Sequence, residues 1–147
     1  MANLIYSALP TPRRKIVYIH PEESIKQCIR MMTELDIGAL VVVDKNKNLI
    51  GIVSERDIVR SCLDQCISLD TGKVSDVVYK DVTILSPHDV VEKAMQVITK
   101  TKRRYVLIRD DDTQEFVAIL SIGDLLYHVL DGKDRTIEHL EKYIYAS

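Results

Sequence analysis

The sequence places the same pair of chemically active residues before two apolar stretches: Ser54 with Asp57, and Ser121 with Asp124. Ser-x-x-Asp at the start of a helix can be a capping box, in which the hydroxyl accepts from a backbone N–H and the acid complements the helix dipole. The same geometry suits a sugar phosphate, because a helix N-terminus attracts phosphate and a carboxylate there can accept from both ribose hydroxyls. The residues alone leave both interpretations open, and both can hold together.

A second candidate for anion chemistry is the pair Arg103-Arg104, which precedes an apolar run. The planar guanidinium can grip a phosphate through two parallel hydrogen bonds. The alternative is a solvated edge of the short basic stretch 100–104. Four scattered histidines (His20, His88, His128, His139) lack metal-ligand spacing, and no nucleophile, base and orienting group or Walker-type loop occurs. We therefore expect a binding protein without a catalytic cofactor, not an enzyme, and no metal site.

The elements that must position these residues occur twice, in residues 17–60 and 82–127. Val17, Ile19, Ile25 and Val41 fall 65 positions before Val82, Ile84, Val90 and Val106, whereas Ile52, Ser54 and Asp57 fall 67 before Ile119, Ser121 and Asp124. This alignment predicts a two-residue insertion between 45–48 and 110–115, in a surface turn.

Each copy predicts strand, helix, strand, strand, helix. The first strand is 17–19 or 82–85, and its helix carries an apolar face at i, i+3, i+4 and i+7, with Ser24 or Asp89 as the N-cap. A buried strand follows at 40–43 or 105–108, then a polar turn, a strand at 49–53 or 116–120, and a second helix from Ser54 or Ser121. The two helical faces are Ile25, Cys28, Ile29 and Met32, and Val91, Ala94, Met95 and Ile98.

One such unit is too small to bury its own sheet, so we expect an α/β (α+β) fold of two β-α-β-β-α repeats packed about an approximate two-fold axis. The predicted boundaries are an N-terminal segment at 1–15, repeats at 16–66 and 74–130, and a C-terminal helix at 131–147. In that helix Ile137, Leu140 and Ile144 form a narrow seam, which predicts docking in cis or, as we favour, across a homodimer.

Composition excludes several other classes of protein. The 147 residues are 46% hydrophobic with a net charge of -2, so a phosphate-neutralising nucleic-acid binder is disfavoured. The longest apolar run, 39–43, is far shorter than a bilayer requires, and the N-terminal charges follow rather than precede the apolar residues 4–9, unlike a signal peptide. Three cysteines without zinc spacing, with Cys28 on an apolar helical face, predict a reducing, cytoplasmic location.

These residues resemble the tandem cystathionine-β-synthase-type (CBS) domain pair, or Bateman module, and especially the stand-alone bacterial and archaeal proteins made only of that pair. The first copy carries Ile-Gly-Ala-Leu-Val-Val-Val-Asp at 37–44 and Gly-Ile-Val-Ser-Glu-Arg-Asp-Ile-Val at 51–59. The second carries Arg-Arg-Tyr-Val-Leu-Ile at 103–108 and Ser-Ile-Gly-Asp at 121–124, and the end near 138–144 also matches. The resemblance covers roughly residues 16–130.

The resemblance implies an adenosine ligand in clefts between the repeats, with AMP expected first and ADP, ATP, NAD or S-adenosylmethionine as alternatives. It also implies a flat dimer. By the same resemblance Asp57 and Asp124 would hold the ribose, Ser54 and Ser121 would lie near the phosphate, and Arg104 and Arg103 would reach phosphates. Gly38 and Ala39, aligned opposite the arginines, would leave more room in the other cleft.

By the resemblance, adenine would lie in an apolar slot against the first and central strands. The apolar residues that could line this slot are equally well explained as part of the hydrophobic core. Tyr18, aligned opposite Thr83, could stack on the base or block its cleft. The candidates are Ile19, Ile37, Ala39 and Ile52 for one cleft, and Thr83, Ile84 and Ile119 for the other.

The leading hypothesis is therefore a regulatory module in which an adenine nucleotide changes the arrangement of the repeats and a partner protein responds. The rival is a constitutive dimeric interaction domain whose clefts are empty or filled by its own side chains, such as Tyr18.

Overall fold

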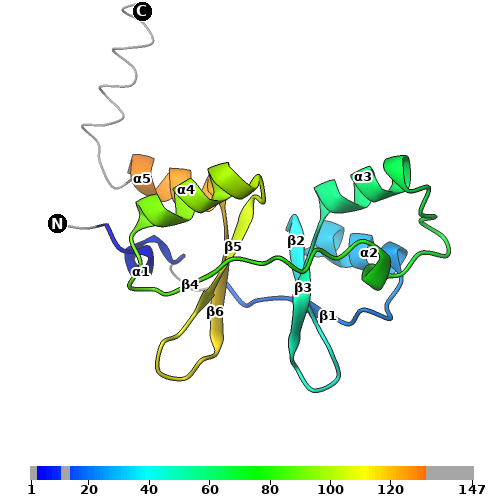
Figure 1. The fold of residues 1–147 in the computed structure, drawn as a ribbon, viewed down its shortest axis with the longest axis horizontal. Helices are drawn as coiled ribbons and strands as arrows, with labels where there is room; N and C mark the ends of the chain where they lie inside the picture. Colours follow the sequence, from blue (N-terminus) through cyan, green and yellow to red (C-terminus); the bar gives the residue numbers. More distant parts are fainter. Residues whose placement is uncertain (1–2, 11–13, 132–147) are drawn as a thin grey trace, which may run out of the picture. The chain divides into compact units, whose positions relative to one another are not determined.

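The computed structural model describes residues 3–10 and 14–131 (Figure 1). Its chain divides into two compact units. Residues 16–82 form one unit, and the other combines residues 83–131 with the N-terminal residues 3–10 and 14–15. The predicted C-terminal helix lies outside the described residues, apart from Asp131. Of the helices within the described ranges, none is long and apolar enough to cross a membrane.

The unit of residues 16–82 contains a three-stranded sheet in the order β1-β2-β3. Strand β1 runs parallel to β2, and β2 pairs antiparallel with β3. The crossover from β1 to β2 is a helix, as parallel neighbours require. The elements are β1 (Tyr18–Ile19), α2 (Ile25–Leu35), β2 (Ala39–Val43), β3 (Leu49–Ser54), α3 (Glu55–Asp64) and the 3₁₀ helix η1 (Val74–Asp76).

The second unit repeats this topology with the sheet order β4-β5-β6. Its elements are α1 (Ile5–Ala8), β4 (Ile84–Leu85), α4 (Val91–Thr101), β5 (Tyr105–Arg109), β6 (Phe116–Ser121) and α5 (Ile122–Asp131). The predicted α/β class and the order strand, helix, strand, strand, helix are confirmed in both copies. Helix α1 was not predicted.

The predicted helical faces form the cores. In the first copy Ile25, Cys28 and Met32 of α2 pack with Leu40 and Val42 of β2. Burial raises the pKa of the Cys28 thiol to about 11, so this thiol is an inert core group as predicted. All five residues of β2 are buried, which agrees with the expectation of a strand covered on both faces. The second core contains the equivalent set Val91, Ala94, Ile98, Val106 and Ile108.

The register of the strands corrects the sequence alignment by one residue. Tyr18 pairs with Val41 and Ile84 pairs with Leu107, so these equivalent positions are 66 apart, not 65. After the hairpin the separation is 67, because Val41 pairs with Ile52 and Leu107 with Ile119. The hairpin insertion is therefore one residue, not two. The alignment was wrong because apolar residues are adjacent in these strands, so that a one-residue shift still matched hydrophobic with hydrophobic.

Three sequence pairings change with this correction. Tyr18 is equivalent to Ile84 rather than Thr83, Arg104 to Gly38, and Arg103 to Ile37. The contrast between an arginine and a glycine persists at one position only.

Of the two caps predicted for the first helix of each repeat, one is confirmed and one is wrong. The Ser24 hydroxyl accepts a hydrogen bond from the Gln27 N–H at 3.0 Å, so Ser24 is the N-cap of α2. Asp89 does not cap α4, whose N-cap is Val90 without a side-chain hydrogen bond. Its carboxylate instead accepts from the Ser86 N–H at 2.8 Å and pairs with Lys93 at 3.1 Å. Asp89 thus closes the turn before the helix.

Each core is completed by a segment from outside the predicted repeat that forms most of that core. We call residues 72–79 the linker strap and residues 3–10 the N-terminal strap. In the linker strap, Val74 is fully buried in the first core, and its N–H donates to the Glu23 carbonyl at 2.9 Å. In the N-terminal strap, Ile5 is fully buried in the second core, and its N–H donates to the Asp89 carbonyl at 2.9 Å.

The two straps use equivalent hydrogen bonds throughout this contact. The Ile25 N–H donates to the Gly72 carbonyl as the Val91 N–H donates to Asn3, and the bond from Ser75 to Pro21 corresponds to that from Tyr6 to Pro87. Each strap therefore packs on the repeat that does not follow it directly in the sequence. The predicted boundaries at 15, 66 and 74 remain predictions.

Candidate functional site

The second Ser-x-x-Asp pair forms a complete capping box at the start of α5. The Ser121 N–H donates to Asp124 Oδ2 at 2.9 Å, and the Asp124 N–H donates to Ser121 Oγ at 3.0 Å. The capping function predicted from spacing is thus present. One carboxylate oxygen, Oδ1, is left for another partner.

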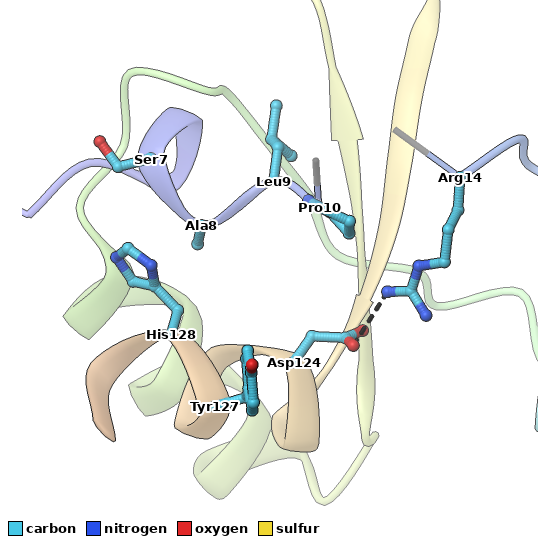
Figure 2. Close-up of a pocket in the computed structure, with 8 residues that line it drawn as sticks. All are labelled: Ser7, Ala8, Leu9, Pro10, Arg14, Asp124, Tyr127 and His128. Atoms are coloured by element: carbon cyan, nitrogen blue, oxygen red, sulfur yellow. Dashed lines mark hydrogen bonds and ion pairs between the residues drawn. The ribbon is translucent and has the colours of Figure 1, made fainter. Parts of the chain in front are cut away.

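That partner is Arg14, a residue that sequence reasoning did not single out. Its guanidinium Nη2 donates to Asp124 Oδ1 at 2.9 Å, and the Arg14 and Asp124 side chains are 57% and 26% exposed. Figure 2 shows the two side chains pointing toward each other, Arg14 from the segment before β1 and Asp124 from α5. The pair joins residues 110 positions apart in sequence.

The pair lies in a cavity of about 460 Å³, which is within the usual range for small-molecule sites. The N-terminal strap provides one wall and α5 another (Figure 2). His128 Nε2, on the α5 wall, lies 2.9 Å from Asn3 Oδ1, which holds the imidazole against the strap. The lining residues are Ser7, Ala8, Leu9, Pro10, Arg14, Asp124, Tyr127 and His128. The cavity therefore combines an apolar wall with one permanent cation, Arg14, and one carboxylate, Asp124.

Pro10 is one difference between the N-terminal strap and the linker strap at this place. At the equivalent place in the linker strap, the Tyr79 N–H donates to the Ile52 carbonyl at 3.0 Å, and the Ile52 N–H donates back to Tyr79 at 3.0 Å. These bonds close the linker strap onto β3. Pro10 has no N–H, so one of these two bonds cannot form with β6.

The first Ser-x-x-Asp pair adopts a different hydrogen-bond state. Ser54 Oγ accepts from the Asp57 N–H at 3.2 Å and donates to Asp57 Oδ2 at 2.5 Å. Ser54 is only 7% exposed. The serine caps α3 as predicted, and its hydroxyl also serves the carboxylate directly.

The remaining predicted residues of the second copy do not line the cavity. Arg104 is exposed, and its carbonyl accepts from the Ile122 N–H at 3.0 Å. Arg103 is half-buried, and its N–H donates to Thr101 Oγ1 at 3.2 Å. Thr83 contributes its carbonyl to the sheet, accepting from Leu107 at 3.0 Å, while Ile84 and Ile119 both pair with Leu107 across the sheet. The binding roles of these five residues remain predictions.

The first-copy candidates are mostly sheet residues. Tyr18 is 42% exposed, whereas Ile19, Ala39 and Ile52 are buried. Gly38 and Ile37 are half-buried at the entry to β2, and the Gly38 carbonyl accepts from the Glu55 N–H at 3.0 Å. Their predicted contact with adenine remains a prediction.

Sequence reasoning missed the strap and Arg14 because no local pattern links residues 7–14 to residue 124. One signal was available: the apolar run at 4–9 lies outside both repeats and needs a surface to cover.

Comparison with known proteins identifies the family. The CBS domain model matches residues 7–64 and again 74–131. The chain belongs to the CBS domain family. Both matches include the strand-to-helix junctions that carry Ser54 and Ser121.

Relatives of this CBS pair occur in several organisms. A mitochondrial CBS domain-containing protein of Arabidopsis thaliana, CBSX3, is 28% identical over 127 residues, which are 84% of this chain and 61% of the relative. A 33.4 kDa protein of Thermofilum pendens is 31% identical over 76% of this chain but only 36% of its own length. The chain thus spans between about one third and three fifths of these two curated relatives.

Solved structures share the fold over nearly the whole chain. A protein with CBS domains from Burkholderia ambifaria is 29% identical with a TM-score of 0.78, covering 86% of this chain and 91% of that one. CBSX2 in complex with AMP is 24% identical with a TM-score of 0.67, covering 88% and 97%. A CBS pair bound to 5′-methylthioadenosine and S-adenosyl-L-methionine is 18% identical with a TM-score of 0.75, covering 90% and 100%.

Proposed function

We propose that this CBS pair is a regulatory binding module for an adenine nucleotide, with AMP as the first candidate. The observation that carries the proposal is the cavity in which a capping-box carboxylate, Asp124, faces a guanidinium, Arg14. Solved relatives with the same fold hold AMP in one case and methylthioadenosine with S-adenosylmethionine in another. These ligands share a ribose that bears adenine. A carboxylate at a helix start can accept hydrogen bonds from the hydroxyls of that ribose.

The proposed roles follow from the hydrogen-bond geometry. Asp124 is held in place because Oδ2 accepts from the Ser121 N–H, so Oδ1 is oriented for a ligand hydroxyl. The start of α5 adds a partial positive charge that favours a nearby phosphate. Ser121 positions the acid, and the apolar wall of Ala8, Leu9 and Pro10 suits a nucleoside better than a strongly hydrated ion.

We further propose that the module acts as a homodimer in a reducing compartment and transmits occupancy to a partner protein. Such regulation requires that the nucleotide bind one arrangement of the protein better than another. The ligand's energy then biases that arrangement.

The proposal is tested by isothermal titration of AMP into the wild type and into Asp124→Ala. Loss of a hydrogen bond to a charged group, about 1.5–3 kcal/mol, should weaken binding about 10- to 150-fold. Asp112→Ala removes an exposed hairpin carboxylate away from the cavity and should leave the affinity unchanged. Equal affinities for all three proteins would show that Ser121 and Asp124 cap the helix and do not contact the ligand.

A second candidate is a constitutive interaction domain, which the internal Arg14–Asp124 ion pair favours because the protein satisfies its own carboxylate. A thermal-shift series with AMP, ADP, ATP, NAD and S-adenosylmethionine separates the two candidates. A bound ligand at 100 times its dissociation constant adds about 2.7 kcal/mol of stability. The absence of any shift would favour the interaction domain.

A further inference from the structure

We infer that Arg14 determines ligand selectivity at the Asp124 site: it covers the carboxylate when no ligand is bound and pairs with the ligand's phosphate once a ribose takes its place. The inference rests on the proposed nucleotide function and adds to it which adenosine compounds bind well. It makes Arg14 a specificity-determining residue for phosphorylated nucleosides over neutral ones.

The first step is competition for one oxygen. Asp124 Oδ2 is committed to the Ser121 N–H at 2.9 Å, within the backbone of the helix start. Oδ1 is bonded to Arg14 at 2.9 Å and is the oxygen available to a ligand. A ribose hydroxyl that approaches Asp124 from the cavity therefore competes with the guanidinium for this oxygen.

The second step is that displacement costs little. The Arg14 side chain is 57% exposed, and an ion pair this open to solvent is weak. Figure 2 shows Arg14 reaching the Asp124 carboxylate from a segment separate from α5, so the side chain can leave without disturbing the helix.

The third step is what the displaced guanidinium does next. Among the eight lining residues Arg14 is the one permanent cation, and the nearby titratable groups are Asp124, Tyr127 and His128. His128 Nε2 lies 2.9 Å from Asn3 Oδ1, so this ring nitrogen already has a hydrogen-bond partner within the protein. A phosphate offers Arg14 a bidentate partner in place of the carboxylate, whereas a neutral nucleoside offers none. With a phosphorylated ligand, a new ion pair between Arg14 and the phosphate thus replaces the Arg14–Asp124 pair that the ribose breaks.

The test measures AMP and adenosine by isothermal titration against the wild type, Arg14→Gln and Lys15→Gln. In Arg14→Gln, AMP should bind about 10- to 100-fold more weakly because a charge-assisted phosphate contact is lost. Adenosine should bind equally well or up to about 5-fold more tightly, because the competing pair is gone. Lys15→Gln removes the same charge from the adjacent exposed residue and should keep the wild-type ratio of the two affinities.

The outcomes separate this inference from the proposed function. An unchanged ratio of AMP to adenosine affinity in Arg14→Gln overturns the role of Arg14 while AMP binding to the wild type upholds the site. A wild type that binds neither compound overturns both. Arg14→Lys is a second variant, which keeps the positive charge but lacks the planar guanidinium. Its affinity for AMP should lie between those of the wild type and Arg14→Gln. Far-ultraviolet circular dichroism of each variant verifies that a change in affinity is not unfolding.

Discussion

The two Ser-x-x-Asp junctions share a sequence pattern but differ in what surrounds them. In the first repeat Ser54 is buried and its hydroxyl donates to Asp57, beside a linker strap that is bonded to β3 through Tyr79. In the second repeat Ser121 and Asp124 form a reciprocal box, and the second carboxylate oxygen of Asp124 pairs with Arg14 in a cavity. The motif sets the helix start in both repeats.

The difference between the repeats comes from the straps. Both begin with the same hydrogen bonds to the turn before the first helix, and both bury one aliphatic residue completely, Val74 or Ile5. They diverge one turn later, where Tyr79 donates to the sheet and Pro10 cannot. Pro10 is thus one difference between the linker strap, which is bonded to its sheet, and the N-terminal strap, which borders a cavity.

The largest expected effect comes from forcing the closed strap open. A Cβ built on Gly51 would lie 2.0 Å from the Tyr79 carbonyl oxygen, so Gly51→Ala should push the linker strap off β3. Overpacking together with two lost hydrogen bonds predicts a destabilisation of about 3 kcal/mol in urea unfolding. The equivalent residue in the second repeat is already Ala118, where the strap carries Pro10.

Gly123→Ala is the matched control for this substitution. The nearest atom to its added Cβ would be Ser121 Oγ at 3.5 Å, an ordinary contact, so the stability should stay within about 1 kcal/mol of the wild type. A Gly51→Ala protein as stable as the control would show that the linker strap does not depend on close approach to β3.

A smaller difference should separate the two cap serines. Ser121→Ala removes one N-cap acceptor, and a loss of about 1 kcal/mol is expected. Ser54→Ala also removes the hydrogen bond donated to Asp57 from a buried site, so about 2 kcal/mol is expected. Chemical denaturation of both variants measures this contrast, which equal losses would contradict.

The smallest effect is a pH dependence that comes from a histidine pair of the second repeat. The hydrogen bond from His88 to Asp111, at 2.7 Å, raises the pKa of the imidazole above its usual value near 6.5. The protonated pair therefore stabilises the fold fully below the pKa of the unfolded state, and this contribution is lost as the pH rises through the higher folded value. Both side chains are exposed, so the effect on overall stability should be minor.

Titration of His88 by nuclear magnetic resonance measures this pKa directly. Asp111→Asn should lower it toward the usual value, because the carboxylate bond is the largest cause of the shift. The equivalent positions of the first repeat are Glu22 and Lys45, so the first repeat has no counterpart of this pair. A His88 pKa that does not respond to Asp111→Asn would exclude the pair as its cause.

The sequence by itself determined the elements of both repeats and the serine caps, but not helix α1 or the cap of α4. Helical spacing identified the faces of α2 and α4, and continuous apolar runs identified β2 and β5, because burial imposes a period that can be recognised locally. Ser24, Ser54 and Ser121 were recognisable as caps because a capping hydrogen bond spans only three residues.

Only the tertiary structure decided the register of the repeats and the composition of the cavity. Adjacent apolar residues such as Val41 and Val42 match at either offset, and strand pairing alone selects 66. The contact between Arg14 and Asp124 joins residues 110 positions apart and depends on where the N-terminal strap packs. No local pattern encodes such a contact, because it results from burying Ile5 in a core formed by the other end of the chain.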